Sequence, residues 1–410
     1  MFTQFPIDFY WGASTSAYQI EGSIEDNNWA NWVEENSVKA SEKYKKNRPE
    51  YMSDENYEDA CTQDNYITGD ACDSYNQYEE DIRILKELGL NAYRFSIEWS
   101  RIEPEKGEYS EEGIQYYKDL IEELRKNNIE PFITCFHWTI PTWLEKEGGL
   151  TSPNMPDYFK EYVEFLVENL GSDVKYWMTV NEPAVVSFAS YMLGNWPPQK
   201  KNPRMFYKVI NNLVDMHKEG YFAIKEFDSE LQVSVAKQNA YVEAYNENPI
   251  NKLIANIGRY FWNFWFLDRV KDDLDYIGLN YYFHRKVGVL GIKDNEEPLN
   301  DVGWWMDPSG IYYPIKELWD RYHLPIYITE NGLADREDKD RKWWLDESVE
   351  ALERSLEEGV DLRGYMHWSL LDNFEWAEGY WPRFGLATRD RKIKDSGYYY
   401  RDLIKRLTVN

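Results

Sequence analysis

Short apolar runs alternate with longer amphipathic stretches along most of the chain. Apolar runs of about four to eight residues are typical of strands buried on both faces, and helical spacing between them is typical of helices that cover a parallel sheet. The pattern predicts strands at residues 9–15, 91–99, 130–138, 175–183, 231–236, 275–282, 325–332 and 362–368, and helices at about residues 75–89, 111–127, 155–170, 206–227, 314–322 and 346–358. Eight strands alternating with helices indicate an α/β fold, a single (β/α)8 TIM barrel over residues 1–410 with loop insertions at the carboxyl ends of its strands.

One stretch interrupts this alternation. From about residue 36 to residue 73 the chain is polar and charged, rich in Asn, Asp, Glu and Lys, and shows no apolar periodicity. Long polar connections of this kind lie on protein surfaces. We therefore expect a long loop or a few short helices here, outside the barrel.

Two of the predicted strands end in a glutamate. The apolar run at residues 175–183 stops at Asn181 and Glu182, and the run at residues 325–332 stops at Glu330. Active sites of (β/α)8 barrels lie at the carboxyl ends of the strands. Two carboxyl groups placed there are what glycoside hydrolysis needs, one to protonate the leaving oxygen and one to attack or to activate water. The plainer alternative is that both side chains merely end strands and face solvent.

Three further polar residues lie in or after predicted strands. Arg94 lies within the strand at residues 91–99, where a charge is too costly to bury without a partner, so it predicts a buried carboxylate beside it. His137 lies near a strand's carboxyl end, where it is either a hydrogen-bonded core histidine or part of a site. Gln19 follows the first strand in a segment polar enough to line a site.

The segment after the last strand, residues 369–381, is dense in acidic residues and tryptophans. Carboxylates bond hydroxyl groups and indoles cover the apolar face of a sugar ring, so this combination is typical of sugar recognition. The alternative is a hydrophobic plug over the barrel mouth. Glu375 beside Trp376 is an odd choice for a plug and favours the sugar site.

Composition narrows the range of partners. Hydrophobic residues make up 43% of the chain and aromatic residues 17%, with 18 Trp and 33 Tyr, which gives a large core and an aromatic excess suited to stacking on sugar rings. The formal net charge is −27, which makes nucleic acid and acidic membrane surfaces poor partners. An acidic mouth also disfavours phosphorylated substrates.

Cysteine and histidine usage gives no sign of a disulfide framework or a metal site. Cys61 and Cys72 either pair within the insertion or stay free, and free thiols are the favoured alternative for these and for Cys135. The five histidines show no metal-ligand spacing. No stretch approaches ~20 apolar residues, and the start of the chain lacks the pattern of a signal peptide. We expect a cytoplasmic protein that does not enter the membrane.

Seven motifs together carry a family resemblance. They are Gly-Ala-Ser-Thr-Ser-Ala-Tyr-Gln-Ile-Glu-Gly (12–22), Arg-Phe-Ser-Ile-Glu-Trp-Ser-Arg (94–101), Phe-His-Trp (136–138), Thr-Val-Asn-Glu-Pro (179–183), Gly-Leu-Asn-Tyr-Tyr (278–282), Ile-Thr-Glu-Asn-Gly (328–332) and Trp-Ser-Leu-Leu-Asp-Asn-Phe-Glu-Trp (368–376). With them the chain resembles the family 1 glycoside hydrolases, the group of retaining β-glucosidases and β-galactosidases. The likeness runs from Phe5 to Leu386. It looks closest to archaeal-type members, because of His367 and residues 318–323.

The resemblance implies a role for each motif residue. Glu182 is then the acid/base and Glu330 the nucleophile, with Arg94, Asn280 and Tyr282 around the nucleophile. The residues implied to contact the sugar are Gln19, His137, Trp138, Asn181, Tyr282, Trp368, Glu375 and Trp376. The resemblance also implies that neither a metal nor an organic cofactor takes part.

The function implied is that of a retaining β-glycosidase of the β-glucosidase type. It would remove terminal β-D-glucosyl, galactosyl or fucosyl residues from small β-glycosides and β-linked disaccharides by double displacement. Two alternatives stay open, a 6-phospho-β-glycosidase and a non-catalytic carbohydrate-binding barrel. Carboxylates at Glu375 and Glu378 would repel a phosphate, and barrels without activity typically lack one catalytic carboxylate. The oligomeric state is open.

Three departures from the family pattern concern the loops around the mouth. The segment between the fifth and sixth strands is short, Thr139 stands where aspartate is common, and the insertion has an unfamiliar composition. They leave the implied chemistry intact and bear on the leaving group that the enzyme prefers.

Overall fold

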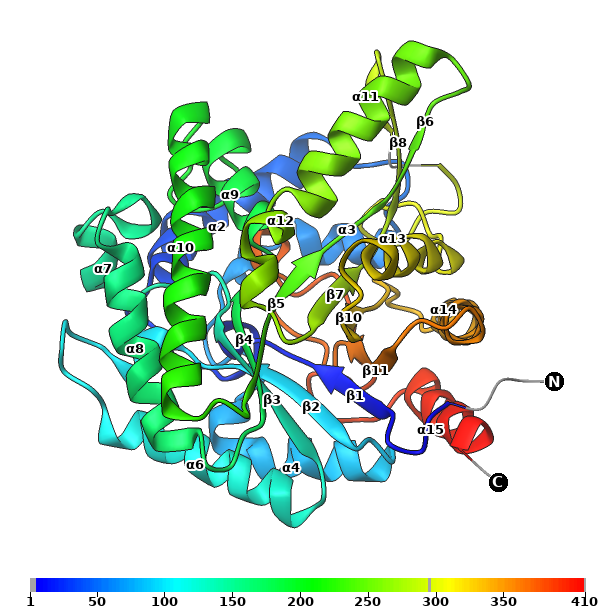
Figure 1. Ribbon diagram of the computed structural model, residues 1–410. Helices are drawn as coiled ribbons and strands as arrows, with labels where there is room; N and C mark the ends of the chain where they lie inside the picture. Colours follow the sequence, from blue (N-terminus) through cyan, green and yellow to red (C-terminus); the bar gives the residue numbers. More distant parts are fainter. Residues whose placement is uncertain (1–4, 294–295, 409–410) are drawn as a thin grey trace.

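A computed structural model describes residues 5–293 and 296–408 of the chain. Eight parallel strands form a closed barrel surrounded by helices (Figure 1). In chain order around the barrel they are β1 (Tyr10–Ser14), β2 (Ala92–Ser96), β3 (Glu130–Phe136), β4 (Tyr176–Asn181), β5 (Gln232–Gln238), β7 (Ile277–Tyr281), β10 (Ile326–Asn331) and β11 (Leu362–Trp368). The predicted (β/α)8 barrel is confirmed; residues 1–4, 294–295 and 409–410 of the predicted span lie outside the described residues.

Helices follow the barrel strands on the outside. The main ones are α4 (Ser74–Glu87), α6 (Glu111–Lys126), α8 (Met155–Leu170), α10 (Pro203–Phe227), α12 (Leu267–Val270), α13 (Tyr312–Tyr322), α14 (Arg341–Glu357) and α15 (Asp395–Thr408). Short helices α1 (Ala17–Ile20), α5 (Trp99–Ile102), α7 (Thr142–Lys146) and α9 (Pro183–Ser187) lie in the loops after strands. The helices α10 and α14 begin three and five residues earlier than predicted, and the sequence pattern did not predict α15.

The local sequence of α6 shows why such stretches are helical. The Ser110 side chain caps the helix by accepting a hydrogen bond from the Gly113 N–H at 3.0 Å. Glutamates occupy the first turn, and Arg125 and Lys126 the last, as the helix dipole favours. One apolar face, which includes Leu120, is buried against the barrel.

An aromatic cluster fills the amino end of the barrel. Its rings belong to Tyr10, Phe132, Tyr176, Tyr276 and Tyr327, one from each of five strands or their approaches. Phe132 and Tyr176 stack with ring centroids 4.3 Å apart and planes within 6°. Smaller side chains, among them Met178, Ala236 and Met366, pack around the rings. The barrel is therefore closed at this end, and a site can open only at the carboxyl ends of the strands.

The polar insertion is more ordered than the sequence indicates. It belongs in part to α2 (Asn28–Lys46), a helix of 19 residues whose first N–H groups are capped by the Asn27 side chain. The expectation of a long loop or short helices is wrong for this part, because α2 buries polar residues such as Ser41 alongside Val33 and Tyr44, which hides its periodicity. Only α3 (Asp54–Ala60) and a turn at Gln63–Tyr66 are short.

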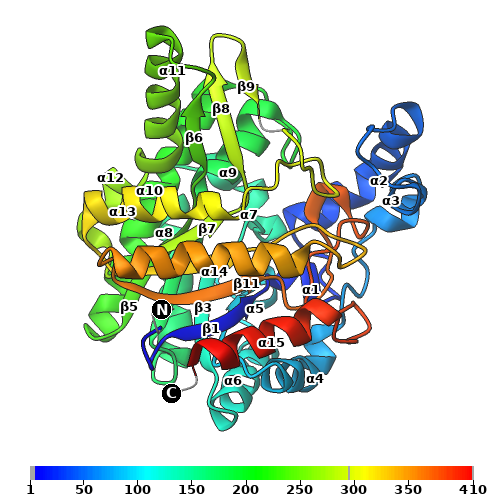
Figure 2. The same ribbon diagram turned by 90° about the vertical axis from the view of Figure 1, so that its right-hand side faces the viewer.

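A second, smaller sheet stands beside the barrel mouth. It has three strands, β6 (Tyr241–Ala244), β8 (His284–Gly288) and β9 (Gly291–Lys293), and α11 (Pro249–Arg259) packs on it. Figure 2 shows this unit projecting above the barrel, with α2 and α3 projecting from another part of the same end. The segment between β5 and β7 was expected to be short, yet it holds β6, α11, the π-helical turn Tyr260–Phe264 and α12.

All three cysteines are free thiols, with Cys72 and Cys135 buried. None of the helices in the described part of the chain combines the length and the apolar character needed to cross a membrane. Within the same residues, no group of three or more His, Cys, Asp or Glu side chains is arranged to hold a metal ion.

The aromatic cluster gives a test of the fold. We expect Phe132→Ala to lower the free energy of unfolding by about 3–5 kcal/mol, since it removes a fully buried ring and leaves a cavity. Phe222→Ala is the matched control, because that ring is 54% exposed on α10 and its loss should change stability by less than about 0.5 kcal/mol. Urea denaturation measures both. Similar losses for the two variants would contradict this account of the barrel core.

Candidate active site

The two strand-end glutamates lie at the same end of the barrel. Glu182 follows β4, and Glu330 is the penultimate residue of β10. Both are buried, and both line one cavity of about 990 Å³. Strand pairing is irregular at both points, between β4 and β5 and between β10 and β7. Glu182 has a φ of 45°, a conformation that non-glycine residues rarely adopt, and Pro183 after it starts α9. Neither glutamate faces solvent, so the plainer alternative is excluded.

Arg94 connects two of these strand ends. Its guanidinium is fully buried on β2, and one Nη donates a hydrogen bond to Glu330 Oε1. The other Nη donates to Asn181 Oδ1 at 2.7 Å, and Nε donates to Thr134 Oγ1 at 3.0 Å. The buried carboxylate that Arg94 predicted is therefore confirmed, and it is Glu330.

The second oxygen of Glu330 also has a donor. The Tyr282 hydroxyl donates to Glu330 Oε2 at 2.6 Å. Burial, and after it the nearby carboxylates, raise the pKa of Tyr282 well above its ordinary value, so this hydroxyl keeps its proton. Charge-assisted bonds to both oxygens favour the ionised form of Glu330.

Glu182 lies in the opposite electrostatic environment. Burial, and after it the charge of Glu330, raises the pKa of Glu182 to about 8. A bond from Asn280 Nδ2 to Glu182 Oε1 at 2.7 Å, together with Lys237 and Arg94, acts in the opposite direction. At neutral pH Glu182 is therefore protonated.

Sequence reasoning missed Lys237, which lies in β5 next to the acid. Its ammonium is fully buried and donates to two backbone carbonyls, those of Gln238 at 2.5 Å and Trp262 at 2.8 Å. Burial lowers its pKa to about 7, while the nearby Glu182 carboxyl opposes that shift. Lys237 directly follows the apolar run at residues 231–236. A charged residue in a buried strand requires a partner, and this is the signal that identified Arg94.

A chain of hydrogen bonds fixes the tautomer of His137. Because Asn181 Oδ1 accepts from Arg94, its Nδ2 is the donor toward His137 Nε2, 3.0 Å away. His137 Nε2 must then accept, and Nδ1 carries the proton. Burial lowers the pKa of His137 well below its ordinary value, so the ring is neutral. Its buried Nδ1 has no hydrogen-bond partner among the described residues, which leaves one N–H donor for a ligand.

The last loop supplies an acid next to Gln19. Gln19 Nε2 donates to Phe374 O at 2.8 Å, to Asn373 Oδ1 at 3.0 Å and to Glu375 Oε2 at 3.3 Å. Burial first, and Glu330 second, raise the pKa of Glu375 to about 8. A hydroxyl-rich ligand would find the Glu375 carboxyl group here, held in place by the Gln19 amide behind it.

The twelve predicted site residues lie in two layers. The cavity is lined by His137, Trp138, Glu182, Tyr282, Glu330, Trp368, Glu375 and Trp376. Arg94, Asn280, Asn181 and Gln19 lie behind them, where their hydrogen bonds fix the lining residues. Lining residues that the sequence did not indicate come from the insertion, the small sheet and the turn at Tyr260–Phe264, among them Lys43, Tyr44, Tyr51, Trp262 and Ile292.

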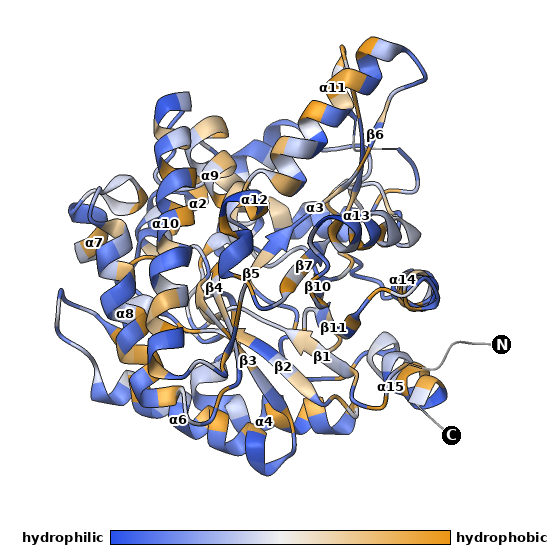
Figure 3. Cartoon of the chain, in the orientation of Figure 1, coloured by the Kyte–Doolittle hydropathy of each residue, from blue (hydrophilic) through white to orange (hydrophobic). Residues whose placement is uncertain are grey.

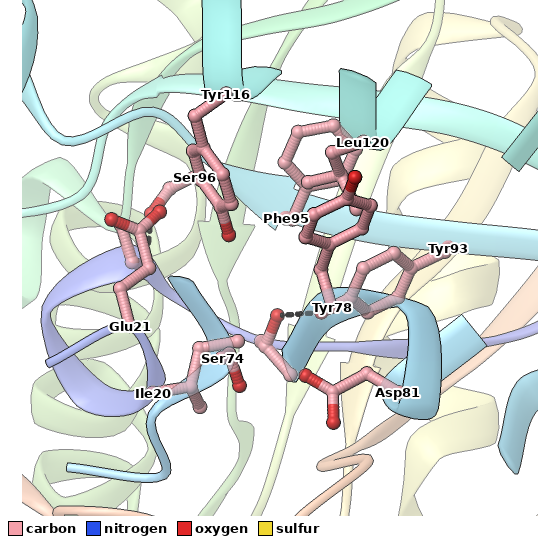
Figure 4. A pocket seen from close by; sticks show the side chains of 12 residues that line it. Ile20, Glu21, Ser74, Tyr78, Asp81, Tyr93, Phe95, Ser96, Tyr116 and Leu120 are labelled. Atoms are coloured by element: carbon pink, nitrogen blue, oxygen red, sulfur yellow. Dashed lines mark hydrogen bonds between the residues drawn. The ribbon is translucent and has the colours of Figure 1, made fainter. Parts of the chain in front are cut away.

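A second cavity, of about 10 Å³, lies between β1, β2 and the helices outside them (Figure 4). It has room for about one water molecule. The two acids on its wall are already paired, Glu21 with Arg101 at 2.9 Å and Asp81 with Arg391 at 2.8 Å. These acids are therefore held in ion pairs and form no reactive pair.

Comparison with known proteins decides the family. The sequence model of "Glycosyl hydrolase family 1" matches residues 1–276 and 267–408. The chain belongs to glycosyl hydrolase family 1. It is a glycoside hydrolase, and the family resemblance found in the sequence is confirmed.

Several relatives are similar over their whole length. The 1,4-beta-D-glucan glucohydrolase of Thermotoga neapolitana is 33% identical over 98% of both chains, and Beta-glucosidase A of Acetivibrio thermocellus is 34% identical with the same coverage. Among solved structures, the beta-glycosidase from Pyrococcus horikoshii has a TM-score of 0.86 at 30% identity, covering 100% of this chain and 99% of its own. The Thermotoga maritima beta-glucosidase in complex with glucoimidazole has the same TM-score and identity, covering 99% and 100%.

The raised pKa of Glu182 predicts how the stability of this family 1 enzyme depends on pH. The folded carboxyl holds its proton up to about pH 8, whereas the unfolded one loses it near its ordinary pKa of 4.5. Stability from this proton is complete below pH 4.5 and is lost as the pH rises to 8. Glu182→Gln removes the effect, so its Tm should fall less than that of the wild type between pH 5 and pH 8.

Thermal melts at unit pH steps measure this difference. Glu230→Gln is the control, because Glu230 is exposed and its change should leave the pH dependence of the wild type intact. Parallel curves for wild type and Glu182→Gln would show that the carboxyl is not protonated in the folded state.

Proposed function

We propose that this family 1 enzyme is a retaining β-glucosidase that removes terminal non-reducing β-D-glucosyl residues from small β-glycosides and β-linked oligosaccharides. Galactosyl and fucosyl residues are further substrates of the same site. The observation that carries the proposal is the contrast between the two buried glutamates. Glu330 is bonded by Arg94 and Tyr282 as an anion, and Glu182 has its pKa raised to about 8.

The first step forms a covalent glucosyl-enzyme. A carboxylate oxygen of Glu330 attacks the anomeric carbon, and the bond from that carbon to the glycosidic oxygen breaks. Glu182 gives its proton to the departing oxygen, so the aglycone leaves as a neutral alcohol. The Arg94 and Tyr282 donors hold the attacking group in place while its charge is lost to the new bond.

The second step returns the enzyme to its starting state. Glu330 is now an uncharged ester, so the repulsion that raised the pKa of Glu182 is gone and its carboxylate can take a proton from water. The hydroxide equivalent attacks the anomeric carbon from the side the aglycone left, and Glu330 departs. Two inversions give a product of retained configuration.

The surrounding residues suit a glucose ring. The free Nδ1–H of His137 donates to one ring hydroxyl, and Glu375, which Gln19 holds from behind, bonds a pair of hydroxyls on the far side of the ring. Trp368 offers an apolar surface to the sugar face. The names of the relatives, glucan glucohydrolase and β-glucosidase, and a relative's complex with glucoimidazole favour glucose among the candidate sugars.

Two other functions are disfavoured by the lining of the cavity. A 6-phosphorylated sugar would meet Glu375 and Glu378, and Lys43 nearby is 3.7 Å from Glu378 and already paired with it. A binding protein without activity would not need two glutamates in opposite protonation states. Turnover of nitrophenyl β-glucoside, compared with its 6-phosphate, distinguishes all three functions in one assay.

Replacing each glutamate tests its role. Glu182→Ala should slow the hydrolysis of alkyl glucosides by about 100- to 10,000-fold. It should slow the hydrolysis of dinitrophenyl glucoside only slightly, since that aglycone leaves without a proton. Azide should then accelerate turnover and give β-glucosyl azide. Glu330→Ala should lose activity by a factor on the order of 10⁴ or more, and azide should give α-glucosyl azide, of opposite configuration. Product configuration is measured by proton NMR. Equal losses for both leaving groups in Glu182→Ala, without an azide product, would remove Glu182 from the acid role.

The pH profile of kcat/KM tests the electrostatic assignment. Its basic limb should lie near pH 8, where Glu182 loses its proton. The charged groups that face this carboxyl are Glu330 from β10, Arg94 from β2 and Lys237 from β5. The charged form of Lys237 stabilises the ionised acid, but with a pKa of about 7 only a minority of these side chains are charged near pH 8. We therefore expect Lys237→Met to move the basic limb slightly to higher pH.

Lys252→Met is the control, because Lys252 lies half-exposed on α11 and pairs with Glu247. It should leave the profile unchanged. If Lys237→Met lowers Tm but leaves the basic limb in place, Lys237 has only a structural role in joining β5 to the turn at Tyr260–Phe264.

A further inference from the structure

The cavity changes character with distance from the two glutamates. Its inner end carries polar side chains such as His137, Glu182 and Glu330. The rest is lined mainly by apolar side chains from outside the barrel: Phe188, Leu193, Phe206, Ile210, Phe261 and Ile292. Its volume of about 990 Å³ lies at the upper end of the roughly 300–1,000 Å³ usual for ligand sites. The outer part therefore has to accept the portion of the substrate that leaves.

The small sheet presents one apolar and one charged face. Its register pairs Ala244 with Val287 and Val287 with Ile292, so these side chains share a face, and the latter two line the cavity. On the other face Lys286 pairs with Glu296 at 2.9 Å. The face of this projecting unit that lines the cavity is therefore mainly apolar, with Arg285 on β8 as the one charged residue among its described residues that line the cavity.

The apolar surface continues from the cavity onto α11. Ile250, Leu253, Ile257 and Phe261 recur at intervals of three and four residues, which places them on one side of the helical segment, and each is between 49% and 60% exposed. Phe261 also lines the cavity, so the stripe is continuous with it. Figure 3 shows hydrophobic segments along α11 where it projects from the molecule. Leu290, in the turn between β8 and β9, is 86% exposed.

A sugar as leaving group would find few polar partners in this part of the cavity, where Asn195 and Tyr207 lie among mostly apolar side chains. Sugar hydroxyls need hydrogen-bond partners when they leave water. The Gln238 amide is already engaged, because its oxygen accepts from Trp262 Nε1 at 2.6 Å and its nitrogen donates to Asn239 O at 3.1 Å. The Arg285 guanidinium lies over the Phe283 ring at 4.1 Å. Apolar surface of this extent, on a chain with a net charge of −27, marks a binding site for an apolar group.

We infer that the cavity and the stripe on α11 form one binding site for a long alkyl chain, so that the preferred substrates are amphiphilic alkyl β-glucosides. The inference rests on the proposed glucosidase function and adds the chemical class of the aglycone. The net charge of −27 opposes approach to an anionic bilayer, so the occupant is the chain of a dispersed amphiphile. Hydrolysis of the glycosidic bond releases it as the corresponding long-chain alcohol.

The dependence of kcat/KM on chain length tests the inference. Methyl, butyl and octyl β-glucosides are compared below the concentrations at which they form micelles. Each buried methylene should raise kcat/KM about two- to fourfold, so the octyl compound should exceed the methyl compound by at least about 100-fold. The kcat/KM for octyl β-glucoside should also exceed that for cellobiose. Calorimetric titration with octyl 1-thio-β-glucoside, which carries a sulfur in place of the glycosidic oxygen, should give a negative heat-capacity change that the methyl thioglucoside lacks.

Phe261→Ser tests the stripe directly, and Phe222→Ser is its matched control. The two rings are 58% and 54% exposed, but only Phe261 lines the cavity. Phe261→Ser should reduce the octyl-to-butyl ratio of kcat/KM severalfold, whereas Phe222→Ser should leave both the ratio and nitrophenyl glucoside turnover unchanged. Ile292→Ser on β9 should reduce the same ratio, and it replaces Phe261→Ser in the test if that variant does not fold.

Failure of this inference differs from failure of the proposed function. A wild-type enzyme that turns over nitrophenyl glucoside but shows no rise with chain length, or prefers cellobiose, overturns the alkyl site alone. An enzyme inactive on every β-glucoside overturns the proposed function as well. A dimer that Phe261→Ser and Ile292→Ser convert into monomers, together with a flat chain-length profile, would assign the stripe to a second copy of the chain and overturn the inference.

Discussion

The buried guanidinium of Arg94 is the constraint on which the site depends. A cation taken out of water in the middle of a barrel is stable only if every donor is matched and a carboxylate lies beside it. Its donors reach Glu330 on β10, Asn181 on β4 and Thr134 on β3, so one side chain on β2 ties three other strands together. Because it bonds Glu330 itself and the amide next to Glu182, the same side chain fixes the positions of both carboxyl groups.

Consequences of that interaction extend to the sugar side of the site. Asn181 accepts from Arg94, and this leaves its amide nitrogen as the donor toward His137. The histidine is then neutral and carries its proton on the free nitrogen, so its role toward a ligand is set by an arginine it does not touch. The aromatic cluster at the amino end has a complementary role, since it closes the barrel below the polar groups.

The sequence predicted the elements that are marked within a single segment, either by a repeating apolar pattern or by a charge in an apolar run. Apolar runs gave all eight barrel strands, and the cost of burying Arg94 predicted its carboxylate partner. The pattern did not give α2, because its buried face mixes Val33 and Tyr44 with Ser41, nor the small sheet, whose strands are short and have one charged face. Lys237 lay just beyond the predicted end of its strand. These failures share one cause: burial there comes from contacts with the barrel mouth, which a single segment of sequence does not record.

Chemistry and leaving-group selection are therefore held by different parts of the chain. The glutamates, Arg94 and Asn280 lie on barrel strands, where closure and the aromatic cluster leave little freedom. Phe261 and Ile292 lie on the unit that projects beside the barrel mouth, and both line the cavity. Rigid strands suit groups that must meet a reacting carbon within a fraction of an ångström, whereas alkyl burial depends on area and tolerates variation in position. Substitutions in the projecting unit can thus change the aglycone without disturbing the protonation states on which the reaction depends.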